Sequence, residues 1–483
     1  MLSFLSLALL ASSVAARPQK FDPNPYTNVL RARQAPTNGS GLEVDLGYAI
    51  YQGTANSTTN INTFLGIRFA APPTGTLRWQ APQAPPVDRS APIPATSYAP
   101  TCPQGPDSSN HIANVNEMLA NEDCLFVNVY SPSNMTGPLP VLVWIHGGGY
   151  GAGNGRQDLS TIINTNGNQF VGVAIQYRLG AFGFLSSDEV YRNGVVNAGI
   201  MDQTFALKWV QQYISQFGGD PRRVTISGES AGGGSTMLQS MVYGGSLGET
   251  LFNNVITASP YLPMQYGYSD WIPSQSYYAF ATAAGCPPSM AYGFNGTTPI
   301  FQCLVSKDSA TLINASATIV QSGTYGTWAF LPVTDGFFIQ DTPSRQFLRG
   351  QINGQNLLAG NNANEGAPFV QRGIITEDDL VNWLHFTFPL FNNKDIAKVL
   401  LYYPSSNSSA TGPLYPTLGD VGPTALNQSS VATGQQQRAD NIYAETTFHC
   451  PAYWMAEAFS NNRHGGAAYK YQFSVPPALH NND

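Results

Sequence analysis

A serine flanked by glycines is the residue of this sequence best suited to covalent chemistry. Gly228-Glu229-Ser230-Ala231-Gly232 fits the pattern Gly-x-Ser-x-Gly, in which a sharp turn from a strand into a helix needs glycines on both sides of the serine. The apolar run 224–227 precedes this turn, and a helical segment over 235–242 follows it. We therefore predict that Ser230 is a nucleophile whose hydroxyl stands above a sheet.

The sequence contains a second match to the same pattern. Residues 244–248 (GGSLG) also place a serine between glycines, but they follow the helical segment and no strand comes before them. The turn needs a strand on its N-terminal side. We interpret this match as a helix-ending loop and Ser246 as a residue without a catalytic role.

A nucleophilic serine needs hydrogen-bond donors for the oxyanion that forms on attack. Residues 146–150 (HGGGY) directly follow a strand-like run, and glycines let the backbone approach a reacting carbonyl closely because they have no Cβ. We assign this oxyanion hole to the backbone N–H groups of Gly148, Gly149 and Ala231, the last at the start of the helix after the nucleophile.

The elements that would hold these residues have the pattern of an α/β protein. The runs 141–146, 171–176 and 224–227 are short, β-branched and bounded by Gly or Pro, as buried parallel strands usually are. Apolar residues over 202–217 repeat at three and four, which predicts a helix, and strand, helix and strand imply a parallel crossover. Residues 262–340 and 366–440 are rich in Pro and Gly, and we expect irregular insertions over one face of the sheet.

Composition excludes several classes of protein. The chain has 483 residues, of which 42% are hydrophobic and only 11% charged, so disorder and a coiled coil are excluded. The net charge is −7 and there is no dense basic run, which argues against a nucleic-acid partner. After the first residues, no run is long and apolar enough to span a bilayer.

The N-terminus and the cysteines point to secretion. Residues 1–16 have the apolar stretch and small-residue end of a signal peptide, and 17–40 form a flexible lead-in. Five cysteines in an oxidising compartment suggest two disulfides and one free thiol, although the residues alone do not fix the pairing. Glycosylation sequons lie at Asn38, Asn56, Asn134, Asn295, Asn314, Asn407 and Asn427.

Several blocks of sequence resemble the type-B carboxylesterase/lipase family, the cholinesterase-like branch of the α/β-hydrolases. They are 64–79 (FLGIRFAAPPTGTLRW), 122–130 (EDCLFVNVY), 176–185 (QYRLGAFGFL), 217–221 (FGGDP) and 228–234 (GESAGGG). The resemblance runs from about residue 42 to the end. It implies a mostly parallel central sheet flanked by helices with loop-rich insertions forming a cap, in one domain over 41–483. It also implies hydrolysis of carboxylic esters by a Ser-Glu-His triad without metal or organic cofactor.

The same resemblance assigns structural roles to several other residues. It implies two disulfides and two ion pairs without catalytic function: Cys102 with Cys124, Cys286 with Cys303, Arg78 with Glu122, and Arg178 with Asp202. Cys450 then remains unpaired, and we expect it to be a small buried hydrophobe.

The acid of the triad should follow the serine and precede the histidine. Glu365 follows the short apolar run 356–359 in an Asn-x-x-Glu-Gly block that resembles the family's, and we predict that it is the acid. Other carboxylates in less suitable settings are Asp335, Asp341, Asp378 and Asp379. Glu229, beside the serine, is expected to be a nearby carboxylate that supports the site.

For the base we choose His480, which follows the strand-like run 469–474 and two prolines. His449, beside Cys450, is the second candidate, although packing explains it well. His385 lies in an apolar run and is expected in the core, and His464 looks like polar decoration at a helix end. Only three residues follow His480, whereas the family continues, so we expect a domain truncated at its C-terminus.

The substrate is predicted from the segment between Cys102 and Cys124, which acts as a lid in lipolytic relatives. Here it is mostly polar, whereas a lid working at a lipid surface should bury an apolar face. We therefore expect a secreted esterase of small ester substrates with short to medium acyl chains. The alternatives are a triacylglycerol lipase and a non-catalytic binding or adhesion protein of the same fold. The oligomeric state stays open.

Overall fold

The computed structural model describes residues 42–105, 120–287, 299–321, 323, 325–403, 434–461 and 465–473. The expected signal peptide and lead-in, His464, His480 and most of the polar lid segment lie outside these ranges, as do the sequons at Asn38, Asn295, Asn407 and Asn427.

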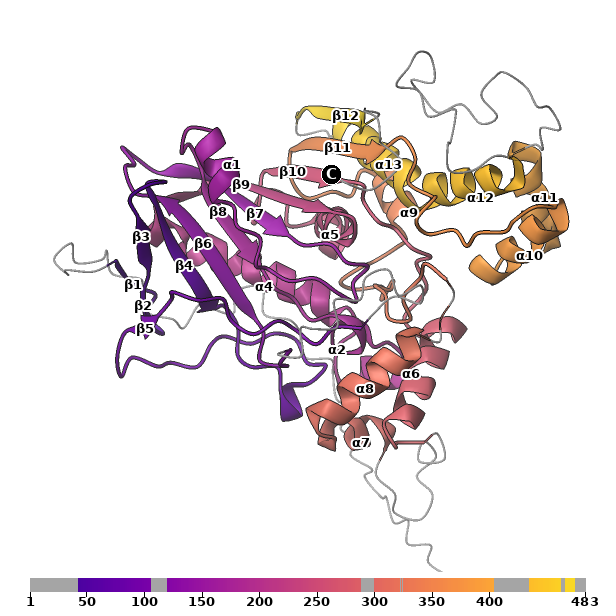
Figure 1. Cartoon of the computed structure of the whole chain (residues 1–483), viewed down its shortest axis with the longest axis horizontal. Helices are drawn as coiled ribbons and strands as arrows, with labels where there is room; N and C mark the ends of the chain where they lie inside the picture. The colour runs from indigo at the N-terminus through magenta and orange to yellow at the C-terminus, as the bar shows by residue number, and fades with distance from the viewer. Residues whose placement is uncertain are drawn as a thin grey trace, which may run out of the picture.

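A large twisted sheet forms the centre of the molecule (Figure 1). Within the described ranges it has nine strands in the order β12-β11-β10-β9-β7-β8-β6-β4-β3. Strands β8, β7, β9, β10, β11 and β12 run parallel to one another, whereas β6 is antiparallel to β8 and β4, and β3 is antiparallel to β4. Their bounds are β3 Thr54–Asn56, β4 Ile61–Arg68, β6 Phe126–Pro132, β7 Leu139–Ile145, β8 Val171–Ile175, β9 Gly219–Glu229, β10 Asn254–Ala258, β11 Asn356–Asn362 and β12 Ala468–Phe473.

The expected parallel strands are confirmed as β7, β8 and β9, and β7 lies between the other two. Their Val and Ile side chains are buried because helices and loops cover both faces of the sheet. A small second sheet joins β1 (Glu43–Asp45), β2 (Ile50–Gln52) and β5 (Ile93–Pro94) near the N-terminal edge.

The expected helix over 202–217 is α4 (Ala198–Tyr213) continued by η2 (Ile214–Phe217), and it packs its apolar face into the core. Helix α5 (Ala231–Gln239) follows β9 directly. The other helices near the sheet are α1 (Ser160–Thr165), α2 (Gly180–Phe184), α3 (Asp188–Asn193), α9 (Pro343–Leu348) and α13 (Cys450–Ser460), the last preceded by a π-helix over Glu445–His449.

The insertions expected to be irregular contain helices, so that expectation was wrong. They are α6 (Trp271–Ala283), α7 (Ile300–Ser306), α8 (Ser309–Gln321), α10 (Glu377–Thr387), α11 (Asn393–Tyr402) and α12 (Gly434–Ala444). In α6 the buried residues Pro273, Tyr277, Phe280 and Ala281 recur at helical spacing, a signal hidden by the surrounding Pro and Gly. Figure 1 shows α6–α8 and α10–α12 on the side to which the arrowheads of β10 and β11 point.

The disulfides and ion pairs implied by the resemblance are confirmed. Cys102 is bonded to Cys124 and Cys286 to Cys303, while Arg78 lies 2.6 Å from Glu122 and Arg178 lies 2.7 Å from Asp202. Cys450 has a free thiol, but it is only partly buried, because its helix packs one face on β11 and turns the other outward. The expectation of a buried Cys450 was therefore wrong.

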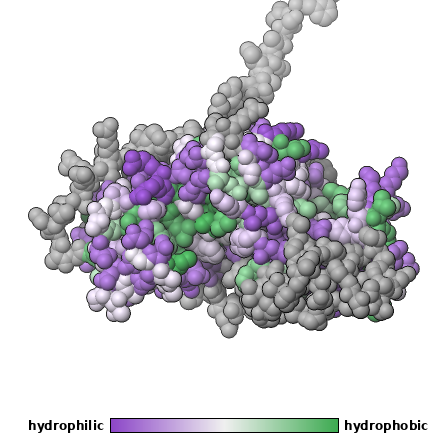
Figure 2. Space-filling model, turned by 90° about the horizontal axis from the view of Figure 1, so that it is seen from above, coloured by the Kyte–Doolittle hydropathy of each residue, from purple (hydrophilic) through white to green (hydrophobic). Residues whose placement is uncertain are grey.

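The surface mixes hydrophilic and hydrophobic residues on the face that Figure 2 shows. None of the helices in the described ranges has the length and hydropathy needed to cross a membrane.

Candidate active site

Ser230 lies at the tip of a strained turn between the last residue of β9 and the first residue of α5. Its φ of 57° and ψ of −122° are rare for a residue with a side chain. The turn is fixed by backbone hydrogen bonds: Ser230 N–H donates to Ala258 O at 3.0 Å, and Ser230 O accepts from Gly234 N–H at 2.8 Å and Tyr261 N–H at 3.0 Å. Backbone strain of this kind is typical of functional sites.

The glycines of the motif are required by the close packing of the turn. A Cβ at Gly228 would lie 2.4 Å from the backbone of Gly232, and a Cβ at Gly232 would lie 2.1 Å from Ile145 O at the end of β7. Ser246, by contrast, follows the short helix η3 (Val242–Gly245) with no strand before it, as expected. The strand-to-helix turn predicted for Ser230 is therefore confirmed.

The glycine turn after β7 lies against the nucleophile. A Cβ at Gly147 would come within 3.1 Å of Ser230 Cβ and 3.0 Å of Glu229 Oε2. Gly148 and Gly149 have φ values of 105° and 61°, which glycine adopts at little cost. The structure thus brings together the backbone segments to which the sequence assigned the oxyanion hole, with Ala231 at the start of α5. The carboxylate of Glu229 adjoins the same turn.

His146 directly precedes this turn, and its side chain contacts the turn backbone and Tyr177. Its ring is buried and stacks on Tyr177 with 4.4 Å between centroids, and its Nδ1 lies 2.9 Å from Gly147 O. Burial lowers the pKa of His146 to about 4, so the ring is neutral at ordinary pH. Sequence reasoning missed this role, although His146 directly precedes the glycines.

Glu365 follows β11 in a loop at the carboxyl end of the sheet, as predicted, and is fully buried. Its Oε1 accepts hydrogen bonds from Ser259 Oγ and from Asn362 N–H, both at 2.6 Å. Hydrogen bonds of this kind stabilise an ionised carboxylate. Ser259 was not singled out from the sequence, because a serine after a short strand belongs to no recognisable motif.

Strand register explains why Ser230, Ser259 and Glu365 come from neighbouring strand ends. Ala258 of β10 is paired with Glu229 on one side and with Gly360 on the other. The chain therefore leaves β9, β10 and β11 at the same edge, where residues at the ends of parallel strands commonly form sites.

The other carboxylates considered for the acid have structural partners. Asp335 accepts hydrogen bonds from Asn197 Nδ2 and from successive backbone N–H groups that follow it. Asp341 forms an ion pair with Arg349 at 2.9 Å, and Asp379 closes a capping box at the start of α10. Asp378 is exposed on the first turn of that helix.

Among the histidines, His449 is buried and its Nε2 lies 3.0 Å from Asn362 O. Burial lowers its pKa to about 4, so packing does account for it. His385 is exposed on α10, so its expected place in the core was wrong. The apolar run around it is the end of an amphipathic helix that turns Trp383 and Leu384 inward instead.

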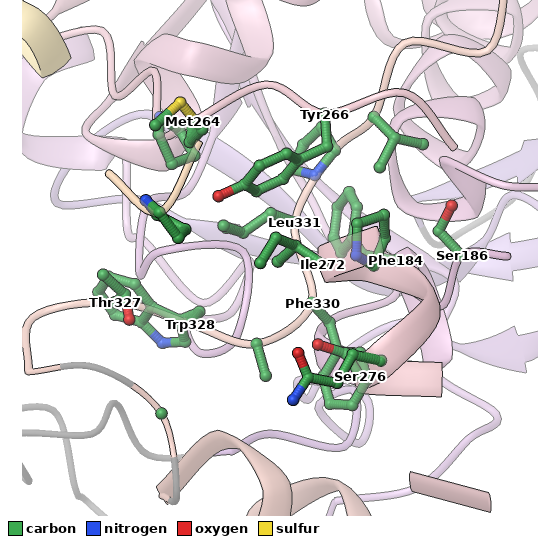
Figure 3. Close-up of a pocket in the computed structure, with 18 of the residues that line it drawn as sticks. Phe184, Ser186, Met264, Tyr266, Ile272, Ser276, Thr327, Trp328, Phe330 and Leu331 are labelled. Carbon is green, nitrogen blue, oxygen red and sulfur yellow. The ribbon is translucent and has the colours of Figure 1, made fainter. Parts of the chain in front are cut away.

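A pocket of about 350 Å³ lies near the Ser230 turn, although Ser230 itself does not line it. Tyr261, which bonds to Ser230 O, lines it, and so does Trp328, whose ring a Cβ at Gly149 would approach to 2.3 Å. Figure 3 shows Trp328, Phe330, Leu331 and Tyr266 around the same hollow. Other lining residues include Phe184, Met264, Ile272, Phe386, Tyr443 and Thr447. Within the described ranges, no group of three or more His, Cys, Asp or Glu residues could hold a metal ion.

Comparison with known proteins decides the family. The family model of the carboxylesterase family matches residues 42–482. The chain belongs to the carboxylesterase family. Lipase 2 of Geotrichum candidum is 32% identical over 439 residues, which cover 82% of this chain and 74% of the lipase. Carboxylesterase patB of Aspergillus clavatus is 29% identical over 495 residues, covering 91% of this chain and 81% of the relative.

Solved structures confirm the fold. The crystal structure of Aspergillus niger EstA superposes with a TM-score of 0.73 at 29% identity, covering 89% of this chain and 77% of EstA. This carboxylesterase thus has the α/β-hydrolase fold that the sequence blocks implied, and it is a carboxylic ester hydrolase.

Proposed function

We propose that this carboxylesterase is a secreted serine esterase with a Ser230-Glu365-His480 triad and an oxyanion hole formed by the N–H groups of Gly148, Gly149 and Ala231. The observation that carries the proposal is the strained Ser230 turn lying directly against the glycine turn after β7. This contact puts a nucleophile beside backbone donors, the combination that acyl transfer requires.

In the proposed reaction, Ser230 Oγ attacks the ester carbonyl while His480 takes its proton. The new C–O bond gives a tetrahedral oxyanion, which the N–H groups of the oxyanion hole stabilise. His480 then returns the proton to the departing alcohol, leaving an acyl-enzyme. Water repeats the sequence, and the carboxylic acid and free Ser230 are restored. The buried carboxylate of Glu365 orients the imidazole and stabilises its charged form.

The assignment of His480 rests on the path of the chain. Phe473, the last residue of β12, accepts a 2.9 Å hydrogen bond from Ala363 N–H, two residues before Glu365. His480 comes seven residues later, and an extended chain of that length reaches about 25 Å at most. His449, the other candidate, is engaged with Asn362 O. Both observations favour His480.

The pocket favours esters with a short or medium acyl chain. Its volume of about 350 Å³ is near the lower end of the usual range for small-molecule sites, roughly 300–1,000 Å³. Trp328 lies across Gly149 and Gly151, so it narrows the space next to the proposed oxyanion hole. A triacylglycerol lipase is the second candidate, favoured by exposed Trp271 and Phe386, which lie next to or in the lining of the pocket.

Secretion is part of the proposal. The signal-like stretch 1–16 and the disulfides Cys102–Cys124 and Cys286–Cys303 support it. Three sequons, at Asn56, Asn134 and Asn314, fall within the described ranges, and we propose that the mature protein is a glycoprotein. Expression of the full chain in a eukaryotic host should give medium-borne protein whose N-terminus is Arg17.

The triad is tested by turnover of soluble p-nitrophenyl esters. We expect Ser230→Ala and His480→Ala each to lower kcat by about 10⁶-fold and Glu365→Gln to lower it by about 10⁴-fold, while His449→Gln keeps most of the activity. If His449→Gln abolished turnover and His480→Ala did not, the base would be misassigned. A steep rate increase above the solubility limit of a long triglyceride would favour the lipase, and absence of turnover in the folded wild type would favour a binding protein.

A further inference from the structure

A chain of hydrogen bonds connects Glu365 to two basic residues outside the proposed triad. Asn362 N–H donates to Glu365 Oε1 at 2.6 Å, and His449 Nε2 lies 3.0 Å from the carbonyl oxygen of the same asparagine. Asn361 Nδ2 donates to that oxygen at 2.8 Å, and Lys470 Nζ donates to Asn361 Oδ1 at 2.5 Å. We call Asn361, Asn362, His449 and Lys470 the acid brace.

The acid brace joins three elements that lie next to Glu365. Asn361 and Asn362 end β11, Lys470 lies on β12, and His449 ends the π-helix before α13. Helix α13 packs on both strands, and Figure 1 shows it beside β11 and β12. β12 is also the strand that precedes His480 in the sequence. Lys470 therefore links the strand before the proposed base to the strand before the acid.

The same region contains the π-helix Glu445–His449. Such segments are rare and occur frequently at functional sites. Within Glu445–His449, Thr447 O accepts a hydrogen bond from Leu262 N–H, and Thr447 lines the pocket. His449, two residues later, lies against Asn362. The π-helix thus places Thr447 in the lining of the pocket and His449 against Asn362, which binds Glu365.

The residues of the acid brace are buried, and one of them is charged. Asn361, Asn362 and His449 are 2%, 1% and 6% exposed, and buried polar groups of this kind are costly to leave without partners. The Lys470 ammonium is partly buried and lies 4.2 Å from the centre of the Tyr453 ring. Burial lowers the pKa of Lys470, and the negative charge of Glu365 opposes that shift. Lys470 is therefore a cation within the field of the triad acid.

Other titratable groups also face this region from the elements packed around β11. From α13 these are Cys450 and Tyr453, with Glu445 of the π-helix facing Cys450, and from β12 the ring of Tyr471 covers Gly360. From the end of β10, Ser259 contributes a hydroxyl to Glu365. Within the described ranges, Lys470 is the member of this set whose positive charge interacts with Glu365.

We propose that Lys470 and His449 are positioning residues for the triad acid: from two sides they fix the Asn361-Asn362 strand end, whose backbone N–H binds Glu365. The inference rests on the proposed triad and adds to it. A loosened strand end would let the carboxylate move away from the base, and rate falls quickly with such misplacement. The Lys470 cation also favours the ionised form of Glu365.

Replacement of Lys470 tests the charge of the brace. Lys470→Met removes a cation that favours ionised Glu365, so Glu365 should protonate at higher pH and the acid limb of the kcat/KM profile should move to higher pH. We also expect kcat to fall about tenfold with KM unchanged. Lys470→Arg should restore the wild-type limb, and Lys394→Met, which removes an exposed cation on α11, should leave the profile unchanged. A Lys470→Met profile identical to wild type would overturn the proposal.

Replacement of His449 tests the hydrogen bond to Asn362 O. His449→Gln retains a donor and should keep kcat within a few-fold of wild type, whereas His449→Leu should lower kcat about tenfold at unchanged KM. Equal kcat values for folded Leu and Gln variants would overturn the role of His449. If His449→Leu failed to fold, the Lys470 series would decide the proposal.

The failure of the brace can be distinguished from failure of the proposed triad. Loss of phosphonate labelling in Ser230→Ala reports on the nucleophile alone, and all brace variants should still be labelled at Ser230, more slowly than wild type. Wild-type protein that is not labelled would overturn the triad and the brace together. Normal labelling and an unshifted pH profile in Lys470→Met would overturn the brace alone.

Discussion

Ser259 Oγ donates a 2.6 Å hydrogen bond to Glu365 Oε1, and both residues are buried at the carboxyl end of the sheet. Because strand β10 lies between β9 and β11, this bond joins the end of the strand next to the nucleophile to the loop that carries the acid. The acid is thus held by a neighbouring strand as well as by its own loop. Several measurable consequences follow from this and the other contacts of the site.

Loss of the Ser259 hydroxyl should make the ionised form of Glu365 less stable while leaving the carboxylate in place. In Ser259→Ala, Glu365 Oε1 keeps its bond to Asn362 N–H but loses a donor to its charged form, so ionised Glu365 is less favoured. We expect kcat/KM for a p-nitrophenyl ester to fall about tenfold at neutral pH, since a hydrogen bond to a charged group contributes about 1.5–3 kcal/mol. Ser259→Thr, which retains a hydroxyl, should lose less; equal losses would argue against the bond.

A side chain at Gly149 should disable the proposed oxyanion hole. The Cβ of Gly149→Ala would lie 2.3 Å from Trp328, at a φ of 61°, so the glycine turn or the Trp328 ring must shift. We expect kcat to fall by about 10²–10³-fold, as for removal of an oxyanion donor. Gly137→Ala is the matched control, because its Cβ would meet no atom within 4 Å. Unchanged kcat in folded Gly149→Ala would contradict the assignment.

Trp328 should limit the length of the acyl chain. Trp328→Ala would open the space between Gly149, Gly151 and the pocket, so esters with longer acyl chains should gain relative to short ones. Each extra methylene that finds room is worth about 0.8 kcal/mol. The measurement is the ratio of kcat/KM for p-nitrophenyl octanoate to that for the acetate. Tyr402→Ala, an exposed change at the end of α11, should leave the ratio unaltered, and an equal ratio in both variants would contradict this role.

The stability of the fold should decrease in mild acid. Burial holds the pKa of His146 and His449 at about 4, below the ordinary value of 6.5, so the unfolded chain binds these protons more readily. The unfolding free energy therefore falls as pH drops from about 6.5 to 4, by up to about 3 kcal/mol for each histidine. Urea unfolding of His449→Gln should show a smaller pH dependence than wild type, whereas His385→Gln, exposed on α10, should match wild type. A matching slope in His449→Gln would refute this.

The sequence predicted the parts of the site that depend on local pattern. The Ser230 turn, the glycine turn and the loop of Glu365 each follow a short apolar strand directly, so a few neighbouring residues specify them. Ser259 and His449 could not be found in this way, because their partners lie far away in the sequence and depend on strand order. His480 stays a prediction.

Helices α6 and α10 show the same limit for the fold. Their apolar spacing was present, but Pro and Gly around them favoured an irregular interpretation, and burial of His385 was wrongly inferred from its apolar neighbours. Which face of such a helix turns inward is decided by what it packs on, and a local window does not contain that information.

The central claim is that Ser230 is the nucleophile of this carboxylesterase. Full-length protein should be treated with a fluorophosphonate, and the modified residue identified by peptide mass mapping alongside residual ester turnover. One adduct on Ser230, absent from Ser230→Ala and retained in Ser246→Ala, with turnover lost in proportion to labelling, is the predicted result. An adduct on another residue, or full turnover in Ser230→Ala, would contradict the account.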